Sequence, residues 1–417
     1  MKDDVKTKTI WLVWKYCRLP GAGVYPARGF SLLREMARRG HDCTIITARH
    51  DWSLSRDKNI LGRDVETVDG VRVITLNILG YRRAKSFQRI LGWLHFEFRV
   101  LFLRLVHVRT PDVIIVSSLS LLSVISGLYF KRKFSCKLIF EVRDIWPLIL
   151  IENGGFSVRN PFVRFLGLLE WAGYKYADQI VGTMPNLGAH VRGILGYDRS
   201  VACIPMGVPE EMISHGASEF PSHLEAVFPK AKFVLTHAGS IGIDNALETL
   251  LDAARLLQDD SQIAFFIIGK GDLVEHYKTV CADLPNVIFA DPVANKYVQP
   301  ILQRSSALYF AAHPTVVLKY GQSLNKLIDY MYSGRPIIGS YSGLPSMVNE
   351  ADCGEFVSAG DALSLVRVLK IWAAKSSVEM DVIGARGRRW VLENRTFDRL
   401  TDDYLALISV PSVSSGD

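Results

Sequence analysis

The stretch Lys319–Ser340, KYGQSLNKLIDYMYSGRPIIGS, is the part of the sequence from which the fold is best inferred. Apolar residues recur at helical spacing from Leu324 to Met331, and this pattern predicts a helix over residues 325–333 with an inward apolar face. The Gly-Arg-Pro that follows predicts the end of that helix, and the Ile-Ile pair after it begins a buried strand. A helix leading into a buried strand is typical of an α/β fold.

Polar residues gather at the start of this helix. Ser323, Asn325 and Lys326 lie at or just inside its first turn, where free backbone N–H groups and the helix dipole favour an anion. Asp329 lies one turn further along on the same side. A cation beside unpaired amides suits a diphosphate, and a carboxylate one turn away suits a diol such as a ribose. The same pattern also fits an ordinary surface helix with a solvated Lys–Asp pair.

Length and composition favour two α/β domains. The chain has 417 residues, of which 22% are charged and 49% hydrophobic, enough for two domains of roughly 200 residues each. Six scattered cysteines without a C-x-x-C pair indicate reduced thiols and predict a cytoplasmic protein. The apolar run at the N-terminus is too short for a signal peptide.

Charge is distributed unevenly. Residues 1–205 have a formal balance of +14 and residues 206–417 of −7, so we expect the first half to face an anionic partner. Segment 81–109 concentrates the basic charge on a helical apolar pattern, which predicts contact with an anionic membrane surface. A core helix with solvated arginines fits the same pattern, and nothing in the segment resembles a nucleic-acid recognition module. The residues expected at the membrane are Arg82, Arg83, Lys85, Arg89, Trp93, Arg99, Phe102 and Arg104.

The first half alternates strands and helices, as doubly wound parallel folds do. Its first strand runs into a glycine-rich loop, in which Gly21 and Gly23 permit a ligand to approach the backbone. Residues 113–130 are nearly long enough for a membrane span, but their place in the alternation predicts a buried strand followed by a helix.

Arg143 and Asp144 follow the predicted strand Lys137–Val142. Ligands of open α/β sheets bind at the carboxyl ends of strands, so this pair could hold a sugar or a diphosphate. A buried ion pair that supports the turn is the structural alternative.

The second half opens with a strand that runs into HAGSIGIDNA, residues 237–246. Its small residues let backbone amides approach a phosphate, and His237 is expected to be structural. Two further strand ends follow along the chain. The donor-site residues expected in these loops are Gly239, Ser240, Gly242, Lys270, Pro292 and Val293.

The run SLNKLIDYMYSGRPII resembles the donor-site signature of the family-four retaining glycosyltransferases. The signature run is most similar to that of the WbuB-like subgroup, which builds O-antigen and capsule with amino sugars, and the run EVRDIWP resembles a motif of the same subgroup. The run IPMGV resembles a further motif of the family, with Met206 in place of Asn. The resemblance implies the GT-B fold, in which two Rossmann-like domains face across a cleft. The implied parts are an acceptor-binding, membrane-facing domain over 1–205, a nucleotide-sugar domain over 206–390, and a closing helix over 391–417 that crosses back.

The resemblance also implies roles for single residues. Asp329 stands where the family binds the donor ribose, and Arg143 and Asp144 match an active-site motif. The loop with Gly23 is expected over the donor pocket, and the backbone near Pro292 is expected to hold the base. The sequence departs from the family at three points. Asp329 replaces the usual Glu, and Gly321 stands in place of the family's first glutamate. The Arg–Lys pair that the family places on the diphosphate is missing, so the diphosphate charge must be neutralised by Lys326, Arg143 and backbone amides.

The function that this resemblance implies is retaining transfer of an N-acetylated amino sugar from a UDP-sugar to a lipid-linked saccharide in bacterial surface-polysaccharide synthesis. Catalysis is assigned to Asp144, Arg143 and Lys326, and no D-x-D pair calls for an obligatory metal or other cofactor. The protein is expected at the inner face of the cytoplasmic membrane. A nucleotide-sugar 2-epimerase and a non-catalytic scaffold of the same fold are the alternatives.

Overall fold

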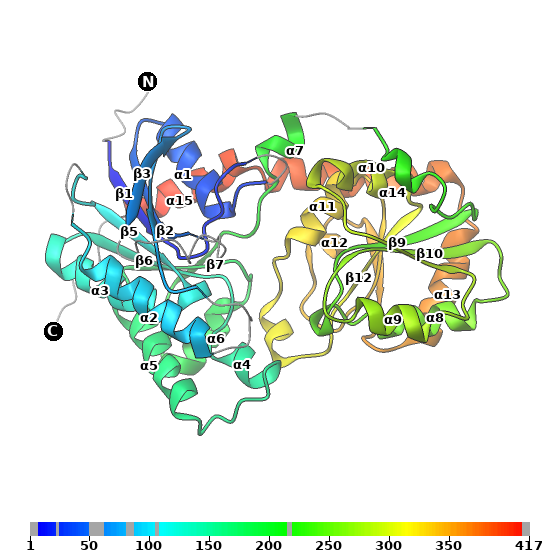
Figure 1. Ribbon diagram of the computed structural model, residues 1–417, viewed down its shortest axis with the longest axis horizontal. Coiled ribbons are helices and arrows are strands. Elements are labelled where there is room, and N and C mark those ends of the chain that lie inside the picture. Colours follow the sequence, from blue (N-terminus) through cyan, green and yellow to red (C-terminus); the bar gives the residue numbers. More distant parts are fainter. Residues whose placement is uncertain are drawn as a thin grey trace. The chain divides into compact units, whose positions relative to one another are not determined.

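The computed structural model describes residues 7–21, 25–49, 62–80, 87–104, 108–214 and 219–410. The chain divides into two compact units (Figure 1). Unit 1 comprises Met1–Pro20, Pro26–Pro205 and Phe397–Asp417, and unit 2 comprises Gly21–Tyr25 and Met206–Thr396.

Unit 1 contains, within its described residues, an eight-stranded sheet of order β3-β4-β2-β1-β5-β6-β7-β8. All neighbours are parallel except β3 and β4, which form an antiparallel pair at one edge. The strands are β1 (Thr9–Val13), β2 (Asp42–Ala48), β3 (Arg63–Val68), β4 (Val71–Leu76), β5 (Val113–Ser117), β6 (Lys137–Val142), β7 (Gln179–Gly182) and β8 (Val201–Cys203).

Helices cover both faces of this sheet, because its central strands are apolar on both sides. On one face α1 and α15 pack together over Ile10, Leu12 and their neighbours. On the other face α3 lies over β5 and β6, with α2 and α5 on either side of it. The helices are α1 (Arg28–Arg38), α2 (Phe87–Leu101), α3 (Ser123–Phe134), α4 (Leu148–Glu152), α5 (Pro161–Tyr176), α6 (Leu187–Leu195) and α15 (Phe397–Ser409).

Unit 2 contains, in its described part, a six-stranded parallel sheet of order β11-β10-β9-β12-β13-β14. This order reverses direction at β9, and such a switch point is where open α/β sheets bind ligands. The strands are β9 (Phe233–Ser240), β10 (Ile263–Lys270), β11 (Val287–Ala290), β12 (Ala307–Ala311), β13 (Ile337–Ser340) and β14 (Gly354–Val357).

Two helical layers enclose the sheet of unit 2. One layer places α8 and α13 over an apolar core that includes Phe265, Ile267 and Tyr309. The other layer places α10, α11 and α14 over Phe310 and its neighbours. The helices are α7 (Glu210–Ser214), α8 (Glu248–Leu256), α9 (Val274–Val280), α10 (Val298–Arg304), α11 (Asn325–Ser333), α12 (Met347–Glu350), α13 (Ala362–Ala373) and α14 (Ser377–Asn394).

The predicted helix over 325–333 is confirmed as α11, and Gly334 closes it in the left-handed conformation with φ +75°. Leu324 was expected on the inward face, but it is 41% exposed because it precedes the helix as its N-cap. The predicted strand and helix within 113–130 are confirmed as β5 and α3. None of the helices that the structure describes is both long enough and apolar enough to cross a bilayer.

Segment 81–109 forms α2 in its described part, and two of the residues predicted to contact a membrane do not face outward. Trp93 is only 3% exposed, because its ring packs edge-on against Trp146 and its indole N–H donates to the Tyr16 hydroxyl at 2.5 Å. Arg99 donates to the carbonyls of Asn77 and Gly62 instead of projecting freely. Phe102 and Arg104 are exposed, and Arg89 lies over the Trp93 ring. Arg82, Arg83 and Lys85 lie outside the described residues.

Candidate donor-binding site

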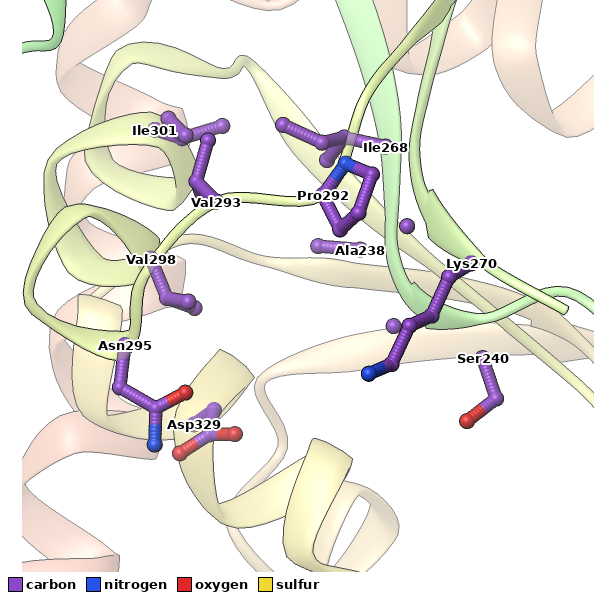
Figure 2. A pocket seen from close by; sticks show the side chains of 12 residues that line it. Ala238, Ser240, Ile268, Lys270, Pro292, Val293, Asn295, Val298, Ile301 and Asp329 are labelled. Atoms are coloured by element: carbon purple, nitrogen blue, oxygen red, sulfur yellow. The ribbon is translucent and has the colours of Figure 1, made fainter. Parts of the chain in front are cut away.

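A pocket of about 290 Å³ lies at the carboxyl edge of the unit 2 sheet (Figure 2). Three consecutive strand ends and the first residues after them form its walls, and α11 contributes one carboxylate. The lining residues are Ala238, Gly239, Ser240, Ile268, Gly269, Lys270, Pro292, Val293, Asn295, Val298, Ile301 and Asp329. Six of them were predicted from the sequence as donor-site residues: Gly239, Ser240, Lys270, Pro292, Val293 and Asp329.

Glycines shape the floor of this pocket. Gly239 and Gly269 have φ values of +139° and +153°, which L-residues rarely adopt. A Cβ on Gly269 would lie 1.7 Å from the Gly239 carbonyl oxygen, so no side chain fits where β9 and β10 end together. The two strand ends therefore present bare backbone to the pocket, as phosphate-binding loops do.

Three hydrogen bonds fix α11 against this floor. The Tyr330 hydroxyl accepts from the Ala238 N–H at 2.9 Å and lies 3.1 Å from the Ala238 carbonyl, to which it donates. The Gln299 side-chain amide donates to the Asp329 carbonyl at 3.0 Å. Because these bonds tie α11 to β9 and to α10, the charged residues of α11 are held in place relative to the glycine-rich strand ends.

Asp329 brings a carboxylate from α11 into the pocket. Burial raises the pKa of this carboxyl to about 7. Within the described chain, no backbone or side-chain donor hydrogen-bonds the carboxylate. Lys270 and Asn295 extend toward the same space (Figure 2). A half-buried carboxylate beside polar groups is a ready acceptor for the hydroxyl groups of a ligand.

Lys326 lies one turn before Asp329, against the backbone of Gly239. A Cβ on Gly239 would stand 3.0 Å from Cε of Lys326, and the ammonium donates to Oδ1 of Asn245 at 2.6 Å. Burial lowers the pKa of Lys326 to about 8, so the group is cationic at neutral pH. The side chain of Lys326 therefore places a positive charge at the glycine-rich end of the pocket.

Besides Lys326, which lies next to the lining residue Gly239, three other described residues that were predicted for the donor site lie outside the pocket lining. The Ser323 hydroxyl accepts from the Met206 N–H at 2.8 Å, so it has a structural bond of its own. Asn325 is exposed at the start of α11, and Gly242 is extended, with φ −148°, before a short 3-10 turn. Gly23 lies outside the described residues. Tyr25, which closes the same loop, packs against the α11 core, and burial followed by the Asp329 charge raises its pKa to about 12.

His237 is buried under the pocket floor and has a structural role. Its Nε2 lies 3.2 Å from the Ser240 carbonyl, and burial together with the Lys326 charge holds its pKa well below the usual value. The ring is therefore neutral and supports the turn after β9.

Arg143 and Asp144 belong to unit 1, where they follow β6. The Arg143 guanidinium lies 4.4 Å from the centre of the Trp14 ring, and burial lowers its pKa. Burial also raises the pKa of Asp144, opposed by the Arg143 charge. The Ser118 hydroxyl accepts from the Arg143 N–H at 2.9 Å and donates to the Asp144 carbonyl at 3.1 Å. Hydrogen bonds to Ser118 hold this turn, which follows β6 at the carboxyl edge of the unit 1 sheet.

Both halves of the chain match known domain families. Residues 27–207 match the glycosyl transferase 4-like domain, and residues 232–373 match the glycosyl transferases group 1 domain. Together the two matches cover most of the sequence, and each falls on one of the two units. The chain is a glycosyltransferase. A comparison with curated protein sequences gave no match.

Solved structures of similar fold span nearly the whole glycosyltransferase. Sucrose-phosphate synthase from Thermosynechococcus elongatus is 16% identical with a TM-score of 0.68, and the alignment covers 96% of this chain and 98% of that one. The trehalose 6-phosphate synthase of Burkholderia multivorans is 12% identical with a TM-score of 0.68, at 96% and 98% coverage. Anabaena HepE in complex with UDP-glucose is 12% identical with a TM-score of 0.64, at 96% and 99% coverage. These likenesses establish the GT-B fold that the sequence predicted.

Sequence reasoning missed the residues that hold the glycosyltransferase's site in shape. Asn245 and Gln299 have roles that depend on hydrogen bonds to α11, over 81 and 30 residues of sequence. Asn295 faces the pocket from the turn before α10, and its position after a predicted strand was the one available signal. Tyr330 is part of the quoted signature, yet its bond to Ala238 has no sequence pattern.

Proposed function

We propose that this glycosyltransferase uses a nucleotide-sugar donor, with UDP as the nucleotide, and that the donor occupies the pocket of unit 2. The observation that carries the proposal is the order of groups along that pocket. Lys326 and the bare backbone of Gly239 form a cationic end suited to a diphosphate, and Asp329 one turn away is an acceptor suited to a ribose. HepE, which has the same fold, is described in complex with UDP-glucose.

The remainder of the pocket suits the base. Pro292, Val293 and Ile301 offer an apolar wall, and backbone groups between β11 and α10 can form hydrogen bonds along it. Asn295 stands between this wall and Asp329 and can reach either the ribose or the base (Figure 2). We therefore assign the base to the 292–298 side and the diphosphate to the glycine-rich side.

The proposed reaction is transfer with retention of anomeric configuration. The bond between the sugar C1 and the diphosphate oxygen breaks, and a bond forms from C1 to the oxygen of an acceptor hydroxyl on the same face. The hydroxyl proton passes to the leaving phosphate oxygen. The residues assigned to this step stabilise the departing charge: Lys326, Lys270 and the amides near Gly239. With two lysines present, we propose that no metal ion is obligatory.

The acceptor that we propose is a lipid-linked saccharide of a bacterial surface polysaccharide such as O-antigen or capsule, and the sugar is an N-acetylated amino sugar. Support for this finer assignment comes from the sequence motifs after β6 and in α11 and from the basic charge of the first half of the chain. Arg143 and Asp144 are the unit 1 residues proposed to contact the substrates.

The experiment is to incubate the protein with UDP-N-acetylglucosamine, UDP-glucose and UDP-galactose, with and without undecaprenyl-diphosphate-linked saccharides, while following UDP release. Acceptor-dependent UDP release that Lys326→Ala abolishes supports transfer. The proton NMR spectrum of the product then reports the anomeric configuration. Conversion of the donor to its epimer without a glycosylated product would contradict transfer and favour the epimerase. Absence of any reaction together with absence of nucleotide binding would favour the scaffold.

A further inference from the structure

Three neighbouring helices of unit 1 present an outward face that the proposed reaction does not use. Helices α2 and α5 each pack against α3, which covers β5 and β6 on one side of the sheet. Large apolar side chains project from this face into solvent. They are Leu94 and Phe98 on α2, Phe102 just after it, Tyr129 on α3, and Phe165 and Leu168 on α5.

The exposure is systematic, because the apolar residues follow the helical repeat. Leu94 and Phe98 are 49% and 55% exposed and stand one turn apart on α2, and Phe102 continues the line. On α5, Phe165 is 40% and Leu168 is 65% exposed. Both helices therefore have a buried stripe toward the interior of unit 1 and a second apolar stripe toward the outside.

Every solvent-exposed charge on these three helices is basic. The sequences of α2, α3 and α5 contain two acids, Glu97 and Glu170, and both are buried. Glu97 accepts from the Ser123 hydroxyl at 2.7 Å, and Glu170 is paired with His190 at 2.6 Å. The exposed cations are Arg132 and Lys133 on α3 and Arg164 and Lys175 on α5.

Some of these cations lie over aromatic rings. The Lys175 ammonium is 4.6 Å from the centre of the Trp171 ring, and the Lys133 ammonium is 5.3 Å from that of Tyr129. Lysine stems lying along aromatic rings, with ammonium groups at the rim, are suited to the boundary between headgroups and acyl chains.

We propose that the outer face of α2, α3 and α5 docks on an anionic lipid bilayer, with Phe165 and Leu168 entering the interface. The basic rim is complementary to acidic headgroups and supplies attraction that neutral lipid lacks. A second copy of the chain is disfavoured as the occupant, because a two-fold contact would bring like charges together. This surface differs from the one expected from segment 81–109, because α5 contributes the apolar anchor and Trp93 is buried.

The test is sedimentation with vesicles of phosphatidylglycerol and phosphatidylcholine, compared with vesicles of phosphatidylcholine alone. Wild type should bind the anionic vesicles and lose binding as salt is raised. The double variant Phe165→Ser, Leu168→Ser should bind at least about tenfold more weakly, since two large apolar groups are removed. Neutralising Arg164 and Lys175 to Gln should weaken binding about fivefold for each charge.

A matched control uses two exposed valines on α14 of unit 2, Val378→Ser and Val382→Ser, which are 69% and 59% exposed in wild type. This control should bind vesicles as wild type does, and UDP affinity should be unchanged in all variants, which separates docking from donor binding. The proposal is overturned if wild type binds neither kind of vesicle, if it binds both kinds equally, or if the α14 control loses as much vesicle binding as the α5 double variant. It is also overturned if sedimentation equilibrium shows that wild type is a dimer and that the Leu168→Ser variant is a monomer.

Discussion

Asp329→Asn is predicted to make the free protein more stable while it weakens donor binding. The pKa of this carboxyl is about 7 in the folded chain, and an unfolded chain has an aspartate pKa of about 3.9. At pH 8 the group is ionised in both states, and the folded state carries the full cost of the buried charge. That difference in pKa corresponds to about 4 kcal/mol, which we halve to about 2 kcal/mol because the side chain is partly exposed.

The sign of the pH dependence follows from the raised pKa. Below about pH 4 the carboxyl is neutral in both states, so the cost vanishes and wild type keeps its full stability. As pH rises from about 4 to about 7 the unfolded state ionises first, and wild type loses stability relative to the Asn variant. The gain of the variant is therefore small at pH 4, grows to pH 7 and is constant above it.

The assay is thermal unfolding of wild type and Asp329→Asn at pH 5 and pH 8 without nucleotide. For a unit of this size, about 2 kcal/mol corresponds to a rise in Tm of roughly 4–8 °C at pH 8, and less at pH 5. Asp272→Asn serves as the control, because Asp272 is exposed in the loop after β10 and its replacement should leave Tm within about 1 °C. A variant that is less stable than wild type at pH 8, or equally stabilised at both pH values, would refute the reasoning.

Four further predictions concern the site and the fold. Lys326→Ala should weaken UDP binding about 10- to 100-fold, because a charge-assisted bond to the diphosphate is lost, whereas Lys326→Arg should lose less in the same titration. Affinity for a UDP-sugar, whose diphosphate does not titrate near neutral pH, should fall between pH 7 and 9 as Lys326 loses its proton, and Lys326→Arg should remove this dependence. EDTA should leave the rate of UDP release within about twofold, and a larger loss that Mg²⁺ restores would contradict the metal-independent proposal. Arg28→Met should destabilise unit 1 by about 3–5 kcal/mol in denaturant unfolding. The substitution removes the ion pair of Glu141 and leaves this buried carboxylate with only the Tyr404 hydroxyl and the more distant Arg143 charge. A loss of stability below about 1 kcal/mol would contradict this reasoning.

Local chemistry in the sequence marks where α11 ends and where α5 begins. The helix of the donor signature ends where Gly334 can adopt a left-handed conformation, and α5 begins at Pro161 after Asn160, whose side chain accepts from the Phe162 N–H at 2.9 Å. Capping residues act within a few positions of the chain, so the local sequence is sufficient to predict where these helices begin or end.

Features that depend on tertiary contacts were not predictable in the same way. The antiparallel hairpin of β3 and β4 was missed for a different reason. β3 is largely exposed and has no apolar alternation, yet Asp69-Gly70 between the two strands, with φ values of +48° and +80°, is a local signal for a two-residue hairpin turn. Trp93 appears on a basic amphipathic segment, yet Tyr16 and Trp146 from other elements bury it. The spacing of residues within α2 cannot reveal which of its two apolar stripes meets the sheet.

The donor site contains residues that local sequence patterns identify and residues whose role depends on tertiary contacts. Asp329 and Lys326 were identified because α11 places them one turn apart, and strand ends were identified because glycines follow buried strands. Ser323 was assigned to the donor on the same basis, but its hydroxyl accepts a hydrogen bond from Met206, which is 117 residues away in the sequence. A residue that can serve either a ligand or a distant backbone group is not resolved by sequence spacing.

The most direct test of the central claim is calorimetric titration with UDP, GDP and ADP of wild type, Asp329→Ala, Lys326→Ala and the control Asp272→Asn. We predict that UDP binds wild type and the control with equal affinity, that GDP and ADP bind more weakly, and that both α11 variants lose UDP binding. If no nucleotide bound wild type, or if UDP bound both α11 variants as tightly as the control, the assignment of the unit 2 pocket as the donor site would be contradicted.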